Sequence, residues 1–241
     1  MKETKEETTE INYIEHQINQ LTPTTVNSDS GLMCTVKHVL NFTMIDGKVC
    51  NAATSTSSTQ KCYICGATSQ QFNKFDELLE RQVDTSTFSF GLSVLHAWIR
   101  FFEYNLHVSY KLPIKTWQAR GEQNKVIVDE RKKQIQKNFL EKLGLLVDKP
   151  KPGFGSTNDG NTARRFFENT ELSSEVTGID QEVIYRQKVI LQTLSSTFHI
   201  KTDLFRTYCL ETARLLIAKY PWYNMPTTVH KILFHSAEII E

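Results

Sequence analysis

Cys62-Tyr63-Ile64-Cys65-Gly66 contains two thiols with two residues between them. Near the far end of the chain, His230-Lys231-Ile232-Leu233-Phe234-His235 contains two imidazoles with four residues between them. Two cysteine thiolates so spaced can bind one zinc ion, because a tight turn brings both sulfurs onto one tetrahedron and the glycine eases the turn. The H-x4-H spacing is within the range of histidine pairs on zinc. The pattern favours one structural Zn²⁺, which requires the last helix to return and lie against the cysteine turn.

Other interpretations of these four residues stay open. A redox role for Cys62 and Cys65 would require a strand before the pair and a helix beginning at its first cysteine, whereas a Ser/Thr-rich stretch precedes the pair and a glycine follows it. Unbound core thiols are a second alternative. On a helix, residues five positions apart differ by about 140° in direction, so His230 and His235 can equally be one surface histidine and one core histidine.

The composition is that of an ordinary globular protein, with 39% hydrophobic and 23% charged residues among 241. The five cysteines are an odd, sparse set that suits thiols in a reducing compartment better than a disulfide scaffold. The first ten residues are charged where a signal peptide is apolar, and no stretch reaches the ~18 apolar residues of a membrane span. We therefore expect a cytosolic or nuclear protein with no membrane partner.

Basic residues gather in the middle of the chain although the net charge is only +1. Residues 111–170 contain 13 Lys or Arg against 7 Asp or Glu, a local excess of 6 positive charges. A cluster of this kind suits a phosphate-binding surface, because each cation that neutralises a phosphate releases condensed counterions. An exposed, solvated helix face is the alternative.

The front of the chain shows both helical and strand periods. Apolar residues three and four apart predict a helix over 4–21, and alternating apolar residues predict one long strand over 32–45 that ends at Asp46-Gly47. The short polar side chains of 50–60 predict a loop.

Beyond the cysteine turn the apolar period is helical. It predicts helices over 75–82 and 91–107, another helix that ends at Gly144, and helices over 181–196, 203–220 and 227–239. A Pro/Gly-rich stretch at 148–162 interrupts them, and its glycines lack the Gly-Lys-Ser/Thr ending of a phosphate-binding loop. Arg164 and Arg165 follow it and suit a phosphodiester, whereas His96, within an apolar-striped helix, is more typical of a core histidine.

Taken in order, these segments resemble Transib transposases and their relative, the catalytic subunit of the V(D)J recombination-activating recombinase. The resemblance covers nearly the whole chain. It is carried by Asp46-Gly47-Lys48-Val49-Cys50-Asn51, Cys62-x-x-Cys65, Leu95-His96, Gly160-Asn161-Thr162-Ala163-Arg164-Arg165 and the final run from His230 to Glu241.

The resemblance implies a cut-and-paste DNA recombinase of the nucleus. Residues 1–60 would be a partial RNase H-like α/β core, and 61–241 a large helical zinc-binding insertion whose segment 111–170 faces DNA, so that the chain is mostly α. In the family, three carboxylates hold two Mg²⁺ or Mn²⁺ ions that activate water and then a 3′-hydroxyl.

Individual residues then take roles from the family. Asp46 resembles the second catalytic aspartate, and the four Cys and His residues match the structural zinc ligands. Arg164 and Arg165 match basic residues that contact DNA, and His96 matches a histidine near the active site.

The chain departs from the family at the other two carboxylates. The first catalytic Asp lies upstream of the segments matched here and the catalytic Glu lies downstream, so neither Glu238 nor Glu241 is assigned to catalysis. We expect a DNA-binding fragment that is not catalytic alone; the complete enzyme would be a homodimer, with a possible accessory recombinase subunit. The alternative is a domesticated, zinc-stabilised module that binds DNA or protein without nuclease activity.

Overall fold

The computed structural model describes residues 13, 16–27, 31–37, 47–153 and 155–241. This part is mostly helical, as predicted, with two small two-stranded sheets. Residues 13 and 16–19, within the helix predicted over 4–21, are helical. The helices that follow are α2 (Gly47–Ala53), α3 (Phe75–Leu79), α4 (Val94–Lys111), α5 (Glu122–Leu143), α6 (Gly160–Glu168), α7 (Thr170–Thr177), α8 (Gln181–Leu194), α9 (Thr202–Lys219) and α10 (Thr227–Ile240), with a 3-10 turn η1 (Thr85–Phe90) before α4. Among the described helices, none is both long enough and apolar enough to cross a bilayer.

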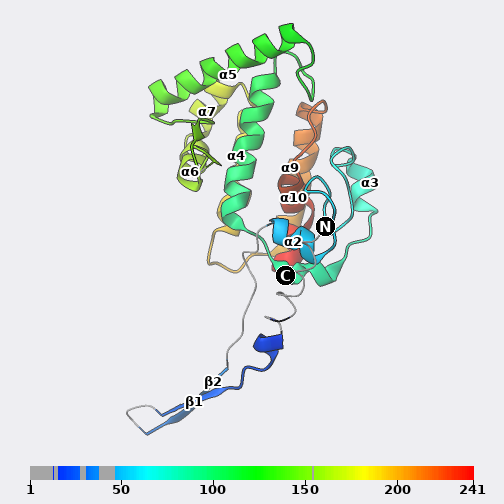
Figure 1. Cartoon of the computed structure of the whole chain (residues 1–241), viewed down its shortest axis with the longest axis vertical. Coiled ribbons are helices and arrows are strands. Elements are labelled where there is room, and N and C mark those ends of the chain that lie inside the picture. Colours follow the sequence, from blue (N-terminus) through cyan, green and yellow to red (C-terminus); the bar gives the residue numbers. More distant parts are fainter. Residues whose placement is uncertain (1–12, 14–15, 28–30, 38–46, 154) are drawn as a thin grey trace.

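The first sheet is a hairpin in which β1 (Thr24–Asn27) pairs antiparallel with β2 (Met33–Val36). Every residue of both strands is exposed, and the hairpin projects away from the helices (Figure 1). The strand predicted over 32–45 is present over 33–36, while 38–46, with Asp46, lies outside the described residues. Of the RNase H-like core expected in 1–60, the described residues show this hairpin and no wider sheet.

The loop predicted over 50–60 begins later than expected, because α2 extends to Ala53. The prediction was wrong there because it took small side chains for solvent-exposed ones. Cys50 and Ala52 are both buried. Thr54 follows the helix and donates its hydroxyl to the Cys50 carbonyl at 2.8 Å.

Helix α4 occupies the middle of the helical body (Figure 1). It contacts α5, α6, α7 and α8, and also α10, which packs along α9. Its buried face is aromatic: the Trp98 ring lies 5.6 Å from Phe167, and the Phe102 ring lies 5.1 Å from Phe166, centroid to centroid. The apolar stripe that predicted this helix therefore faces the core.

The structure confirms both the predicted helix end at Gly144 and the predicted interruption of the helices at 148–162. Gly144 adopts the left-handed conformation (φ +60°) and ends α5, its N–H reaching the Leu140 carbonyl. The predicted interruption contains the second sheet, β3 (Pro150–Lys151) with β4 (Gly155–Ser156), after which the Asp159 carboxylate accepts the Thr162 N–H at 2.8 Å and caps α6.

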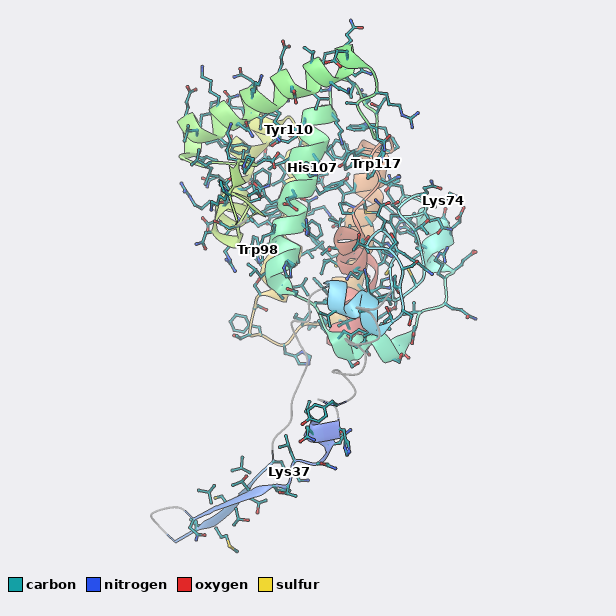
Figure 2. All side chains as sticks on the ribbon, in the orientation of Figure 1. Lys37, Lys74, Trp98, His107, Tyr110 and Trp117 are labelled. Carbon is teal, nitrogen blue, oxygen red and sulfur yellow. The ribbon has the colours of Figure 1, made fainter. Side chains whose placement is uncertain are left out.

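Side chains fill the space between these helices (Figure 2). Phe166 is fully buried and contacts three other phenylalanine rings at 5.0 to 5.9 Å. We expect Phe166→Ala to lower the free energy of unfolding by about 3–5 kcal/mol, because it leaves a cavity that the neighbouring rings cannot fill. Chemical denaturation would measure the loss.

The matched control is Phe198→Ala, since the Phe198 side chain is 82% exposed. It should change the free energy of unfolding by no more than about 0.5 kcal/mol. Equal losses in the two variants would contradict this description of the core.

Candidate metal centre

The two cysteines and the two histidines are far apart in the sequence but lie together in the structure. Their candidate ligand atoms all lie within 4.8 Å of one another, and all four residues are buried. Around zinc, tetrahedral ligand atoms stand about 3.3–3.8 Å apart, given bond lengths of about 2.0–2.3 Å. The Cys65 Sγ and His230 Nε2 atoms are already 3.3 Å apart. This cluster can therefore hold a metal ion such as zinc.

A tight turn presents the two sulfurs. The Cys62 carbonyl accepts the Gly66 N–H at 2.8 Å, and the Cys62 N–H reaches the Ala67 carbonyl at 2.8 Å, so that Lys61 and Thr68 pair as an isolated bridge. Gly66 has a φ of +69°, in the left-handed region that only glycine enters at little cost. The glycine after the cysteine pair is thus a requirement of the turn.

Helix α10 presents both imidazoles to the interior. His230 is 0% exposed and His235 is 4% exposed, and their rings meet edge to face with centroids 5.1 Å apart. The alternative of one surface and one core histidine is therefore wrong. The two side chains point in different directions from the helix axis, but both are buried, because α10 is buried on most of its circumference, including Val229, Leu233 and Ala237.

Two imidazole nitrogens in the cluster have no hydrogen-bond partner. His235 Nε2 is buried and unpaired, and so is His230 Nδ1, whose ring lies between Phe72 and Phe234 at 4.4 and 5.0 Å. An unsatisfied buried polar atom costs about 1–3 kcal/mol. A metal ion bound at His235 would remove that cost for one of the two nitrogens, so the residues fit the ion.

The two sulfurs have opposite acid–base tendencies. The pKa of Cys65 lies far below its usual value because the Cys62 thiol and then the His230 ring hydrogen-bond to its sulfur. Burial raises the pKa of Cys62 and lowers the pKa of His230. A bound dication would favour the ionised form of both sulfurs, because a thiol that coordinates a metal loses its proton.

Residues 59–73, which contain both cysteines, form the cysteine segment. Hydrogen bonds also join this segment to the beginning of α10 and the residues just before it. Asn73 donates its side-chain N–H to the Tyr223 carbonyl at 3.0 Å and accepts the Met225 N–H at 3.2 Å. The Thr227 hydroxyl donates to the Thr59 carbonyl at 2.8 Å. These contacts hold the two pairs of candidate ligands in register.

None of the other described candidate residues belongs to this cluster. His96 is exposed at the start of α4, with Nδ1 2.7 Å from the Ser93 hydroxyl, so it is not a core histidine. Arg164 stacks over Trp98 at 5.7 Å, and Arg165 donates to the Leu143 carbonyl at the end of α5. Asp46 lies outside the described residues.

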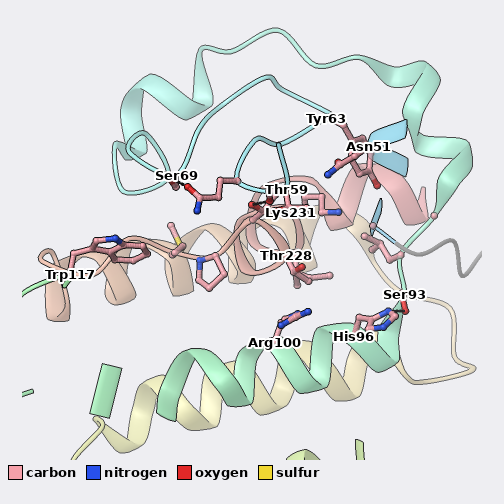
Figure 3. Close-up of a pocket in the computed structure, with 18 residues that line it drawn as sticks. Asn51, Thr59, Tyr63, Ser69, Ser93, His96, Arg100, Trp117, Thr228 and Lys231 are labelled. Carbon is pink, nitrogen blue, oxygen red and sulfur yellow. Dashed lines mark hydrogen bonds between the residues drawn. The ribbon is translucent and has the colours of Figure 1, made fainter. Parts of the chain in front are cut away.

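The sequence analysis did not identify Arg100, a residue near His96. Arg100 follows His96 by one helical turn, and both residues line a cavity of about 560 Å³ to which Gly47, the residue after Asp46, also contributes (Figure 3). The i, i+4 spacing of two basic groups on one helix was the available signal.

Comparison with known proteins identifies no family for the chain that carries this centre. Neither the scan against protein-family models nor the search of curated proteins gives a match. The donor set itself limits the metal: two sulfurs and two imidazoles suit zinc, whereas Mg²⁺ and Mn²⁺ prefer oxygen ligands. The centre therefore provides no support for Mg²⁺ or Mn²⁺.

Removal of one sulfur should release the metal. We expect Cys62→Ser protein to contain much less than one equivalent of zinc and to melt at a lower temperature, because the binding free energy of a structural zinc is also folding free energy. Elemental analysis and thermal melting would measure the two effects, and a chelator should lower the melting temperature of the unmodified chain.

The control is Cys209→Ser, a change of the same kind at a buried cysteine whose sulfur lies beside Ser236, outside the cluster. It should keep its zinc whatever its effect on melting. Unchanged melting after verified zinc removal from the unmodified protein would contradict a structural role for the ion.

Proposed function

We propose that this chain is a zinc-stabilised, DNA-contacting segment of a Transib-like cut-and-paste recombinase. One observation carries the proposal: the thiol pair and the imidazole pair lie together in a buried cluster although their nearest members, Cys65 and His230, are 165 positions apart. These two pairs are, with the segment from Gly160 to Arg164, the most specific elements of the resemblance, and the family's structural zinc requires the two pairs to meet. In this proposal, 1–60 is a partial RNase H-like core and 61–241 is the helical insertion.

Contact with DNA is supported by the exposed basic side chains of the segment 111–170. Several of them form ion pairs at the surface, such as Lys142 with Glu175 and Lys151 with Asp159. Exposed ion pairs contribute only about 0.2–1 kcal/mol each, so a phosphate can compete for these cations. Arg164, on α6, is exposed as well.

In this proposal the protein acts in the nucleus, and the complete enzyme is a homodimer that can include an accessory recombinase subunit. The Mg²⁺ or Mn²⁺ ions of the parent reaction would need carboxylates besides Asp46, the one catalytic carboxylate that the resemblance assigns within these 241 residues. Nicking and hairpin formation are therefore activities of the parent enzyme.

A domesticated module that binds protein, without nuclease activity, is the second candidate. It is supported by an exposed apolar surface at the turn between α8 and α9. Phe198 and Leu204 are both exposed there and line a hollow of about 500 Å³. A patch of this kind on a soluble domain often marks a contact site. Salt-sensitive binding to DNA separates the two candidates.

We expect the chain to bind double-stranded DNA with an affinity that falls steeply as salt rises. Arg164→Gln should weaken binding roughly 3- to 10-fold and reduce the salt dependence by about one counterion, because it removes one cation from the phosphate-facing surface. Fluorescence anisotropy over a range of salt concentrations would measure both quantities.

The matched control is Arg214→Gln. Arg214 is also exposed and also stacks over an aromatic ring, 4.5 Å from the Phe75 centroid, but lies outside the basic segment. It should leave DNA binding unchanged. Absence of DNA binding even at low salt would favour the protein-binding module.

We expect no nicking of supercoiled DNA by the isolated chain in Mg²⁺ or Mn²⁺, because one aspartate cannot hold two divalent ions against water. Asp46→Asn should behave like the unmodified chain in this gel assay. Metal-dependent nicking that disappears in Asp46→Asn would show instead that the chain carries a working metal site.

A further inference from the structure

The hollow at the turn between α8 and α9 is a groove between two helices. Residues at helical spacing line it on both sides: α8 and its last turn contribute Val189, Gln192, Thr193 and Ser196, and α9 contributes Leu204, Phe205 and Tyr208. Side chains three, four and seven positions apart lie on one face of a helix. The two helices contact each other, so these faces form the two walls of one groove, with residues 198–201 of the connection at its end.

The groove is apolar and open to solvent. Phe198 is 82% exposed and Leu204 is 66% exposed, and Tyr185, one turn before Val189 on α8, is 53% exposed. The other faces of the two helices are already covered, since α8 packs on α4, α6 and α7, and α9 packs on α10. The exposed side chains therefore do not belong to the core of the chain, and their burial by a partner would favour association.

The groove also has a positive charge at the end where the helices connect. Lys201 and His199 belong to its lining, and the described lining residues include no Asp or Glu. Asp203 is the single acidic residue between positions 188 and 206, a stretch that also contains Lys188 and Arg206. A surface with an excess of one sign of charge attracts partners of the opposite sign and disfavours partners of the same sign.

The other acidic residues of the two helices do not offset this charge, because an arginine already balances them. Glu182 on α8 and Glu211 on α9 lie 4.0 and 2.9 Å from the Arg186 guanidinium. Arg186 itself stacks over Tyr208, 4.2 Å from the ring centroid. The two carboxylates and the arginine thus form one network beyond the groove, and Lys201 remains the charged group of its lining.

The shape of the groove fits a helix. A groove between two packed helices accepts a third helix, whose apolar residues at i, i+3, i+4 and i+7 fit between the ridges of the pair. The face of α8 that runs from Tyr185 to Ser196 covers eleven positions, which corresponds to about 16 Å, or roughly three turns of a partner helix. Acidic residues beside the apolar stripe of such a helix would complement Lys201.

We propose that this groove binds an acidic amphipathic helix of a partner protein, with Phe198 and Leu204 as apolar anchors and Lys201 as the charged contact. The inference rests on the second candidate of the proposed function, a protein contact at this surface, and goes beyond it by naming the chemistry of the partner. It does not depend on the DNA contact of 111–170, which involves other residues.

The test is fluorescence anisotropy of three labelled peptides of about 15 residues, each titrated with the zinc-loaded full chain. The first peptide has a leucine stripe and a glutamate polar face, the second has lysine in place of glutamate, and the third has serine in place of leucine. The acidic amphipathic peptide should bind at least roughly tenfold more tightly than either of the others at low salt, because it alone matches both the apolar walls and the charge of the groove.

Two substitutions in the groove should weaken binding of the acidic peptide. Phe198→Ala should weaken it roughly tenfold, because large aromatic anchors contribute most to such interfaces. Lys201→Gln should weaken it roughly two- to fivefold and reduce its salt dependence, because an exposed charge pair contributes less. Both side chains are exposed, and circular dichroism and zinc content of each variant would show that the fold is retained.

The matched controls are Leu79→Ala and Lys74→Gln, at the two ends of α3. Leu79 is 45% exposed, the Lys74 side chain is 54% exposed, and neither residue lines the groove. Both variants should bind the acidic peptide as the unmodified chain does.

Each other occupant of the groove gives a distinct result. Equal binding of the acidic and basic peptides, lost in Phe198→Ala, would overturn the acidic partner and keep a protein contact at this surface. Absence of binding by all three peptides would overturn the inference and remove the support for the protein-binding candidate. Duplex DNA binding that is weakened by Phe198→Ala without peptide binding would assign the groove to DNA, and a dimer detected by light scattering and lost in Phe198→Ala would assign it to a second copy of the chain; either result overturns the inference.

Discussion

The contact between the cysteine turn and α10 is the constraint on which the rest of the structure depends. It joins residues 165 positions apart, with Cys65 Sγ and His230 Nε2 at 3.3 Å. Closing so long a loop costs conformational entropy, although the cost grows slowly with length. The hydrogen bonds of Asn73 and Thr227 offset part of that cost in the same place. A metal ion would add four bonds at this closure, where each also fixes the orientation of a buried side chain.

Two regions of the fold depend on this closure to different degrees. The aromatic core between α4, α5 and α6, built around Phe102, Phe139 and Phe166, is made of helices close in the sequence and lies away from the metal cluster. The cysteine segment, by contrast, is short of regular structure, and hydrogen bonds of Asn73 and Thr59 join it to residues 223–227. Removal of a bound ion would therefore act first on the cysteine segment, because α4 to α8 retain their own buried contacts.

The sequence predicted most of the helices and singled out the two cysteines and two histidines that cluster, because each of these signals is local. An apolar stripe reports one buried face, and a glycine after the stripe reports the left-handed residue at Gly144. What it missed depends on tertiary contacts. Cys50 and Ala52 read as loop residues because their small side chains show no period, yet they are buried in the folded chain. His96 read as a core residue because it lies within an apolar-striped helix, whereas its own side of the helix is exposed and lines the cavity.

Charge counts along the sequence also differ from charge in space. The basic excess of 111–170 is partly used inside the fold, since Arg131 donates to the Thr177 carbonyl and Arg165 to the Leu143 carbonyl. Arg100 and Lys231, far apart in the sequence, instead line one cavity. Tyr63 and Lys231 also line this cavity, and each is adjacent in the sequence to a candidate metal ligand, Cys62 and His230 respectively. An ion that holds the cysteine turn against α10 would therefore also fix part of the lining of this cavity.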